Sequence, residues 1–196
     1  MKEIKILSND KQIYKVNDFI LKGKDYNDAI GIIFGSPIIG LRLLAFDSWV
    51  GSWDNDEDIP IKFICESEAV QILCGLDTTK RIVESQKNSN KLTAAKWCWN
   101  YQKGNFQWYL PSLMELGALF LIRDQINNTI KQLGGDLLPT ENSDNTCIWS
   151  SSKYDSIGIW SVDFSYGDFS VNYNDYNFSV RAITVFDSIG YNNLIK

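Results

Sequence analysis

The residues best suited to chemistry lie in one polar, aromatic stretch near the end of the chain. Between Asp163 and Ser179, fifteen of seventeen residues are Asp, Phe, Ser, Tyr or Asn, three of each. Antibody paratopes use a similar alphabet, in which Tyr supplies rigid contact area and Ser and Asn supply adaptable hydrogen bonds. The pattern indicates recognition of a partner by surface complementarity. The alternative is an ordinary polar β-meander with Asn and Asp turns.

We expect the recognition surface to combine aromatic anchors with short polar groups on a β scaffold. Its expected members are Tyr154, Asp155, Ser156, Asp163, Tyr166, Asp168, Asn172, Tyr173, Asn174, Asp175, Tyr176 and Asn177. The segment from Trp108 to Ser112, together with Trp149 and Trp160, is expected to form the supporting core instead.

The residue type that most readily exchanges protons near neutral pH is missing. The chain has no histidine, which removes Ser-His-Asp and Cys-His catalysis and every metal site built on imidazole. Carboxylate pairs such as Asp163 and Asp168 could serve a glycosidase, but sequence spacing cannot establish the separation that this reaction requires. No glycine-rich phosphate loop or dinucleotide fingerprint occurs. We expect no catalytic residue, no cofactor and no enzymatic activity; a carboxylate or lone-cysteine enzyme is the alternative.

An acidic loop from Asp54 to Asp58 begins like the D-x-D-x-D of a calcium loop. Ile59 stands where such a loop has glycine, and Cys65 stands where it has glutamate. We interpret the segment as a solvated acidic loop and expect no metal site. The four cysteines show neither CxxC pairing nor zinc-binding spacing, which is typical of reduced, buried thiols.

The charge balance argues against nucleic acid as a partner. The net charge is −5 and the chain has no basic run, whereas phosphate contacts need clustered Lys and Arg. The first ten residues lack the apolar core of a signal peptide. The apolar stretch from Ala29 to Phe46 is broken by glycines, Pro37 and Arg42, unlike a membrane span. We expect no membrane insertion, and a non-standard export route if the protein acts outside a cell.

Two blocks of strands flank a helical middle. Strand-like alternation covers residues 4–7, 13–21, 30–34, 41–46, 148–150, 159–164, 169–173 and 180–186. Short helices are expected at 67–75, 78–86 and 94–101, and a long helix begins at Pro111 and closes at Gly134-Gly135. This order predicts an α+β fold. Arg181, in an expected buried strand, is predicted to form a structural ion pair.

A series of motifs resembles Lcl C-terminal-domain-like proteins over roughly residues 76–186. The segment from Trp108 to Leu116 resembles their "WYLPSxxEL" core, and Ala94 to Tyr101 resembles the "AAxWC…Y" element before it. Trp149 to Tyr154 resembles "WSSTEY", and Trp160 to Ala182 resembles the closing "W.V.F..G…VR" pattern. The stretch from Ala29 to Phe34 also resembles an "AIGIVF" strand of phage and gut-bacterial members.

The resemblance implies a C-type-lectin-like fold with two main helices and a small antiparallel sheet, preceded by a short β-rich N-terminal region. It also implies likeness to the variable proteins of diversity-generating retroelements, which display a hypervariable binding face on phage tails or cell surfaces. Formylglycine-generating enzymes share that fold distantly, but of their C-terminal cysteine pair only Cys147 is present. The calcium-lectin motifs EPN, QPD and WND are absent. We divide the chain into an attachment or oligomerisation part, 1–64, and a ligand-binding domain, 65–196.

Together these observations predict a non-enzymatic ligand- or receptor-binding protein, with a phage tail or virion adhesin as its leading identity. The expected partners are a bacterial surface protein or glycan and other virion proteins, and a homotrimer is kept open. The expected location is the virion, assembled in the host cytoplasm, or alternatively the cell surface. The alternatives are a virion structural component with a lectin-like domain and no external ligand, and an enzyme related to formylglycine-generating enzymes.

Overall fold

The computed structural model describes residues 4–53, 59, 61–143 and 145–187. The strands of these residues are β1 (Lys5–Ser8), β2 (Ile13–Lys15), β3 (Ala29–Ser36), β4 (Gly40–Gly51), β5 (Cys147–Lys153), β6 (Gly158–Asp163), β7 (Phe169–Tyr173) and β8 (Phe178–Val185). The helices are α1 (Val16–Leu21), α2 (Glu66–Ala69), α3 (Leu76–Ser85), α4 (Ala94–Asn100), α5 (Leu113–Phe120) and α6 (Arg123–Leu133).

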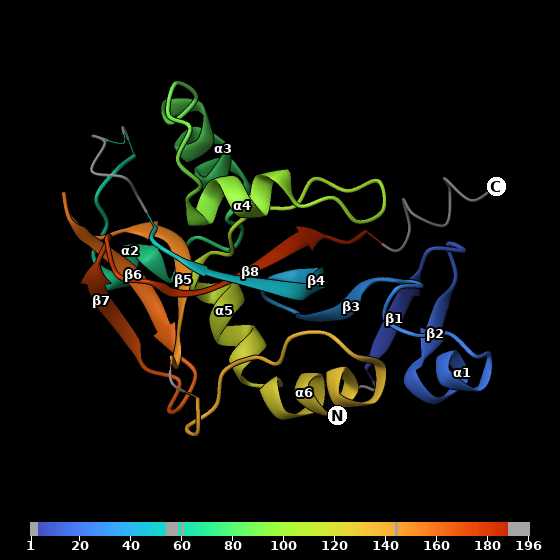
Figure 1. Cartoon of the computed structure of the whole chain (residues 1–196). Helices are drawn as coiled ribbons and strands as arrows, with labels where there is room; N and C mark the ends of the chain where they lie inside the picture. Colours follow the sequence, from blue (N-terminus) through green and yellow to red (C-terminus); the bar gives the residue numbers. More distant parts are fainter. Residues whose placement is uncertain (1–3, 54–58, 60, 144, 188–196) are drawn as a thin grey trace.

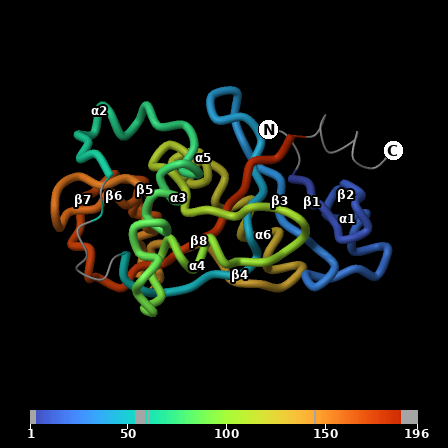
Figure 2. Tube along the Cα trace, turned by 90° about the horizontal axis from the view of Figure 1, so that it is seen from above, coloured from blue at the N-terminus to red at the C-terminus, as the bar shows by residue number. Residues whose placement is uncertain are grey.

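One mixed sheet of eight strands runs through the described chain, in the order β2-β1-β3-β4-β8-β5-β6-β7. Neighbouring strands are antiparallel except β5 and β8, which are parallel through the pair Ile148 and Ser179. Figure 2 shows β5, β6 and β7 at one end of the molecule and β1, β2 and α1 at the other. The edge strands of the sheet are therefore β2 and β7.

Helices cover both faces of the sheet (Figure 1). On one face, Ile82 of α3 and Ala95 of α4 pack in a core cluster with Trp149 of β5. On the other face, Leu116 of α5 and Ile130 of α6 belong to a second cluster. A strand covered on both faces can be buried at successive residues, as β8 is from Val180 to Thr184.

This architecture corrects the fold expected from the sequence. The predicted C-type-lectin-like fold, with two main helices and a small antiparallel sheet after a β-rich N-terminal region, is wrong, because the sheet has eight strands and the six helices are short. The last strand, β8, pairs with β4 between Arg42 and Gly51, so early and late strands share one sheet. Periodicity identifies strands but not their partners across the chain. A division of function between 1–64 and 65–196 stays a prediction.

Two further expectations from the sequence are wrong, one for a strand and one for a helix. Residues 13–21 form β2 and then α1, whose Phe19 is buried, rather than one strand. The expected long helix is α5 followed by α6, because the backbone leaves helical geometry at Ile122 (φ −119°, ψ 12°). Both helices face the same core cluster, so the apolar spacing continues across the break and does not reveal it. Ser112 caps α5 by accepting a hydrogen bond from the N–H of Glu115, so this helix starts after Pro111.

A buried carboxylate links the sheet to the helices. Glu115 Oε1 accepts hydrogen bonds from Arg42 Nε at 2.5 Å and from the Tyr109 hydroxyl at 2.8 Å. Its Oε2 accepts from the backbone N–H groups of Gly75 at 3.0 Å and Ser112 at 2.9 Å. One side chain therefore joins β4, the start of α5 and the segment that leads into α3. Removing one partner of such a buried ion pair leaves an uncompensated charge and costs about 3–5 kcal/mol.

We expect Glu115→Gln to lower the free energy of unfolding by about 3 kcal/mol, because the neutral amide leaves the Arg42 guanidinium buried without its counter-charge. Urea denaturation followed by tryptophan fluorescence measures the change. Glu84→Gln is the control, since Glu84 forms an exposed pair with Lys80, and it should change stability by under about 0.5 kcal/mol. Equal effects of the two variants would contradict this role of Glu115.

Candidate recognition site

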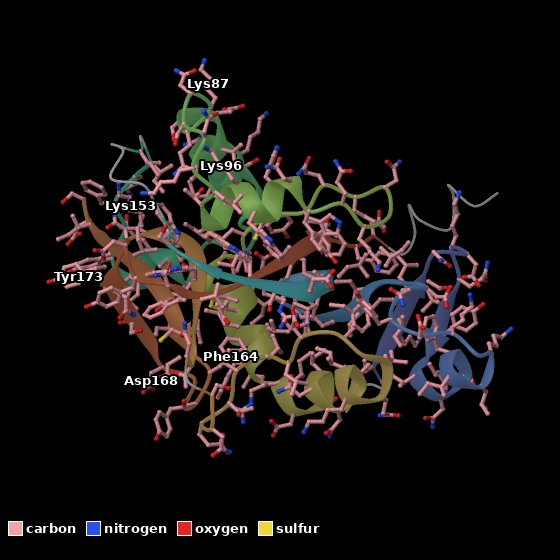
Figure 3. The ribbon with its side chains drawn as sticks, in the orientation of Figure 1. Lys87, Lys96, Lys153, Phe164, Asp168 and Tyr173 are labelled. Atoms are coloured by element: carbon pink, nitrogen blue, oxygen red, sulfur yellow. The ribbon has the colours of Figure 1, made fainter. Side chains whose placement is uncertain are left out.

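The structure divides the expected recognition residues between the two ends of β7. Strands β6 and β7 pair from Gly158–Tyr173 at one end to Val162–Phe169 at the other. The β5–β6 and β7–β8 turns therefore share one end, and the β6–β7 turn lies about 13 Å away, at roughly 3.3 Å per residue. Figure 3 shows Tyr173 and Asp168 at these separate places. The sequence suggested one continuous surface, and the structure makes two.

We call residues 154–157 and 173–177 the aromatic end. It contains the expected Tyr154, Asp155, Ser156, Tyr173, Asn174, Asp175, Tyr176 and Asn177, together with the exposed Ile157, which the sequence analysis missed. Tyr166 and Asp168 lie in the β6–β7 turn, Asp163 is the last residue of β6, and Asn172 lies within β7. The sequence signal for Ile157 is its place directly before Gly158 in a polar turn segment, and its exposure is known only from the structure.

The tyrosines of the β7–β8 turn are connected to the core through the half-buried Phe178. Tyr173 and Tyr176 meet edge to face, with 5.6 Å between ring centroids. Tyr176 meets Phe178 in the same way at 5.8 Å, and Phe178 lies 4.5 Å from the buried Trp149. These ring contacts connect the surface tyrosines to the ordered core. Edge-to-face pairs also contribute free energy beyond that of area burial.

The tyrosine of the β5–β6 turn has a similar support. Tyr154 packs edge to face on Trp160, with 5.5 Å between centroids. The indole of Trp160 donates to the carbonyl of Ile64 at 3.0 Å, and that of Trp149 donates to the carbonyl of Gly51 at 3.0 Å. These hydrogen bonds hold the indoles of Trp160 and Trp149 against neighbouring segments of the backbone. The rings that pack on these indoles therefore have an ordered support.

The phenolic hydroxyls of the aromatic end are available to a ligand. Those of Tyr154, Tyr173 and Tyr176 form no hydrogen bond within the described part of the chain. By contrast, the Tyr101 hydroxyl donates to Asp47 at 2.5 Å, which together with burial raises the pKa of Tyr101. The unpaired hydroxyls therefore distinguish the aromatic end from a tyrosine that serves the fold.

Three of the expected polar residues hold the scaffold. Asp155 Oδ1 accepts hydrogen bonds from two backbone N–H groups of the β5–β6 turn at 3.0 and 2.6 Å. Asp163 Oδ1 accepts from a backbone N–H of the β6–β7 turn at 2.7 Å. The amide of Asn172 donates to two serine hydroxyls at 2.9 and 3.0 Å. Side-chain to backbone bonds of this kind define turns.

Asn174 is the most enclosed polar residue of the aromatic end. The residue is 7% exposed. Its N–H donates to the carbonyl of Ile157 at 2.9 Å, and its carbonyl accepts from the N–H of Trp53 at 3.0 Å. Its side-chain amide forms no hydrogen bond with the residues that the structure describes. The amide is not among the fully buried polar atoms without a partner, so its donors and its acceptor are open to solvent and to a ligand.

The buried cation near the site belongs to the core. The guanidinium of Arg181 donates to the carbonyls of Ala45, Phe46, Asp136 and Leu137 at 2.8–3.3 Å, where the sequence led us to expect a carboxylate. Burial lowers the pKa of Arg181 to about 10, so the group keeps its charge at neutral pH. Four backbone carbonyls therefore take the place of the expected carboxylate. The sequence does not distinguish these two ways of stabilising a buried arginine.

The chemistry around the site does not favour catalysis. Burial and the neighbouring Asp163 raise the pKa of the Cys147 thiol, whereas a cysteine nucleophile needs a lowered pKa. In the described ranges, no cluster of three or more metal-binding side chains is suited to a metal ion, and no helix has the length and apolarity to cross a membrane. The acidic loop from Asp54 to Asp58 lies outside the described residues.

A second surface feature escaped the sequence analysis. An apolar groove of about 450 Å³ lies between the β3–β4 turn, α5 and the β6–β7 turn, and its lining includes Ile38, Met114, Leu121 and Phe169. Leu121 is 80% exposed and stands where the long apolar pattern breaks between α5 and α6. The break itself turns this leucine outward, and no sequence signal marks it.

Comparison with known proteins finds a structural likeness without a sequence relative. No protein-family model matches the chain, and no curated protein matches it. Among solved structures, the chain resembles a fimbrial protein from Bacteroides ovatus, with a TM-score of 0.67 and 11% identity. The likeness covers 95% of this chain and 49% of the fimbrial protein, so the chain spans about half the length of that neighbour. At this identity the likeness concerns the fold.

We expect Asp155→Ala to destabilise the protein by about 1 kcal/mol, because two turn N–H groups lose their acceptor. Thermal unfolding measures the loss, and amide exchange should accelerate at Ile157 and Gly158. Asp175→Ala is the control, since the exposed Asp175 carboxylate accepts no hydrogen bond from the described residues and its removal should leave stability unchanged. Unchanged exchange at Gly158 in Asp155→Ala would refute the turn role.

Proposed function

We propose that this protein is a non-enzymatic, adhesin-like surface protein that binds its partner through the aromatic end. The observation that carries the proposal is the set of surface rings of Tyr154, Tyr173 and Tyr176, which ring contacts connect to the buried indoles of Trp160 and Trp149. Rings that are already ordered lose little conformational entropy on binding, so contact area converts efficiently into affinity. The fold shared with a fimbrial protein fits such a role.

The narrower proposal is a phage tail or virion adhesin, with the bacterial cell surface as the alternative setting. Its support is the series of motifs that resemble Lcl C-terminal-domain-like and diversity-generating-retroelement proteins, together with the Tyr, Asn, Asp and Ser alphabet of the aromatic end. A bacterial surface protein or glycan is the partner proposed in this setting.

We expect the double variant Tyr173→Ala/Tyr176→Ala to bind bacterial envelope preparations at least about ten-fold more weakly than the unaltered protein, because central aromatic anchors dominate interfaces. Sedimentation of labelled protein with envelopes measures binding, and circular dichroism verifies folding. Tyr166→Ala is the matched control, since Tyr166 is 76% exposed against 55% for Tyr173 but lies at the opposite end of β7.

Full binding by the double variant, or an equal loss in Tyr166→Ala, would place recognition elsewhere on the surface. No binding by the unaltered protein across a broad panel of bacteria would favour a structural subunit instead.

A structural subunit is the second candidate, and the apolar groove favours it. Exposed apolar surface such as Ile38 and Leu121 marks protein–protein contacts. If the protein assembles through this groove, as a homotrimer or otherwise, Leu121→Asp should shift it toward monomer in size-exclusion chromatography with light scattering. Leu21→Asp on α1 is the control, because Leu21 is similarly exposed and lies outside the groove. A monomeric unaltered protein at high concentration would count against this candidate.

A further inference from the structure

The charge of the aromatic end bears on the class of its ligand, an inference that rests on the proposed function. From Tyr154 to Val180 the chain contains four aspartates and neither lysine nor arginine. The basic residues on either side are both enclosed. Lys153 is 1% exposed, with its ammonium 5.4 Å from the ring centroid of Phe63, and Arg181 is held by backbone carbonyls. The surface of this segment therefore presents rings and carboxylates without a cation.

The two turns of the aromatic end each contribute one carboxylate beside a tyrosine. Asp175 is exposed, and its carboxylate has no hydrogen bond or ion pair with the described residues. Asp155 uses Oδ1 in its turn, which leaves Oδ2 free of turn contacts. The exposed Lys62 on a neighbouring segment already pairs with Glu68 at 2.5 Å.

We propose that the aromatic end binds a Lys- or Arg-bearing segment of a partner protein. Cations are attracted to the faces of aromatic rings within about 6 Å of the centroid, and guanidinium groups also stack on them. Asp155 and Asp175 supply the complementary charge. The side-chain amide of Asn174, a largely buried residue between Tyr173 and Tyr176 in the sequence, supplies a donor and an acceptor, which match the C=O and N–H of a peptide group.

The alternative ligand classes use less of the site. A neutral saccharide would engage the rings and Asn174, but the two carboxylates would gain no opposite charge. An anionic ligand would be repelled by the aspartates and by the net charge of −5. A basic peptide segment is the class that uses the rings, the carboxylates and the amide together.

The test uses the full chain and two labelled Gly-Ser peptides of equal length, with either Arg or Glu at alternate positions, and soluble dextran as a neutral polysaccharide. Fluorescence anisotropy measures peptide binding, and affinity electrophoresis in a dextran gel measures saccharide binding. We expect the Arg peptide to bind and the Glu peptide not to bind. The affinity for the Arg peptide should fall by about ten-fold between low and high salt, as for other charge-assisted complexes.

Matched variants separate the aromatic end from general charge. Tyr176→Leu keeps apolar bulk but removes the ring, and should weaken Arg-peptide binding by about three- to five-fold. Asp175→Asn removes one charge and should have a similar effect. Tyr166→Leu and Asp168→Asn make the same chemical changes at the β6–β7 turn, and both should leave the affinity within about two-fold because that turn is distant.

The remaining outcomes would each overturn one or both proposals. Equal weakening by Asp175→Asn and Asp168→Asn would show attraction by net charge alone and would overturn the inference. Dextran binding that depends on Tyr176, without preference for the Arg peptide, would overturn the ligand class and leave the proposed function standing. Failure to bind either peptide, together with envelope binding that depends on Tyr173 and Tyr176, would also overturn the ligand class and leave the proposed function standing. Failure to bind peptides, dextran and envelopes would overturn both proposals.

Discussion

The carboxylate of Glu115 is the constraint on which the rest of this structure depends. Four donors from three parts of the chain converge on it, and one of them is the guanidinium of Arg42 in β4. Burying two opposite charges is favourable only when their hydrogen bonds are nearly complete, so the positions of β4, α5 and the segment before α3 are mutually determined. The Tyr109 hydroxyl joins the same network, and its backbone forms a bridge to Ile183 of β8.

The three strands β5, β6 and β7 depend on a different set of polar contacts. Only one residue pair, between Ile148 and Ser179, links β5 to β8 in the sheet. The indole groups strengthen this junction, because Trp149 donates to Gly51 across it and Trp53 donates back to Ser150 at 2.7 Å. Tryptophan is suited to this work, since its ring fills the core while its single N–H satisfies a backbone carbonyl.

In the proposed function, the same aromatic residues connect stability to recognition. The rings that fill the core beneath β5 and β6 also support Tyr154 and Tyr176 at the surface. A binding surface built on core residues is ordered before its partner arrives, whereas the same tyrosines on a mobile loop would have to be ordered during binding. Burial and the neighbouring Asp163 raise the pKa of Cys147, so this thiol is not activated as a nucleophile.

The sequence alone identified the composition of the proposed recognition surface, the burial of Trp149 and Trp160, and most strand positions, because local periodicity and residue type are properties of neighbouring residues. It placed the helix start at Pro111 from the preference of proline for the first helical position, whereas α5 begins at Leu113 after the Ser112 cap. Only the tertiary structure decided that β8 pairs with β4, that Tyr166 is separated from Tyr173 by the length of β7, and that Leu121 rims a groove. Each of these outcomes depends on which distant segments meet, and strand pairing across the chain is set by the global packing of the core rather than by any local pattern.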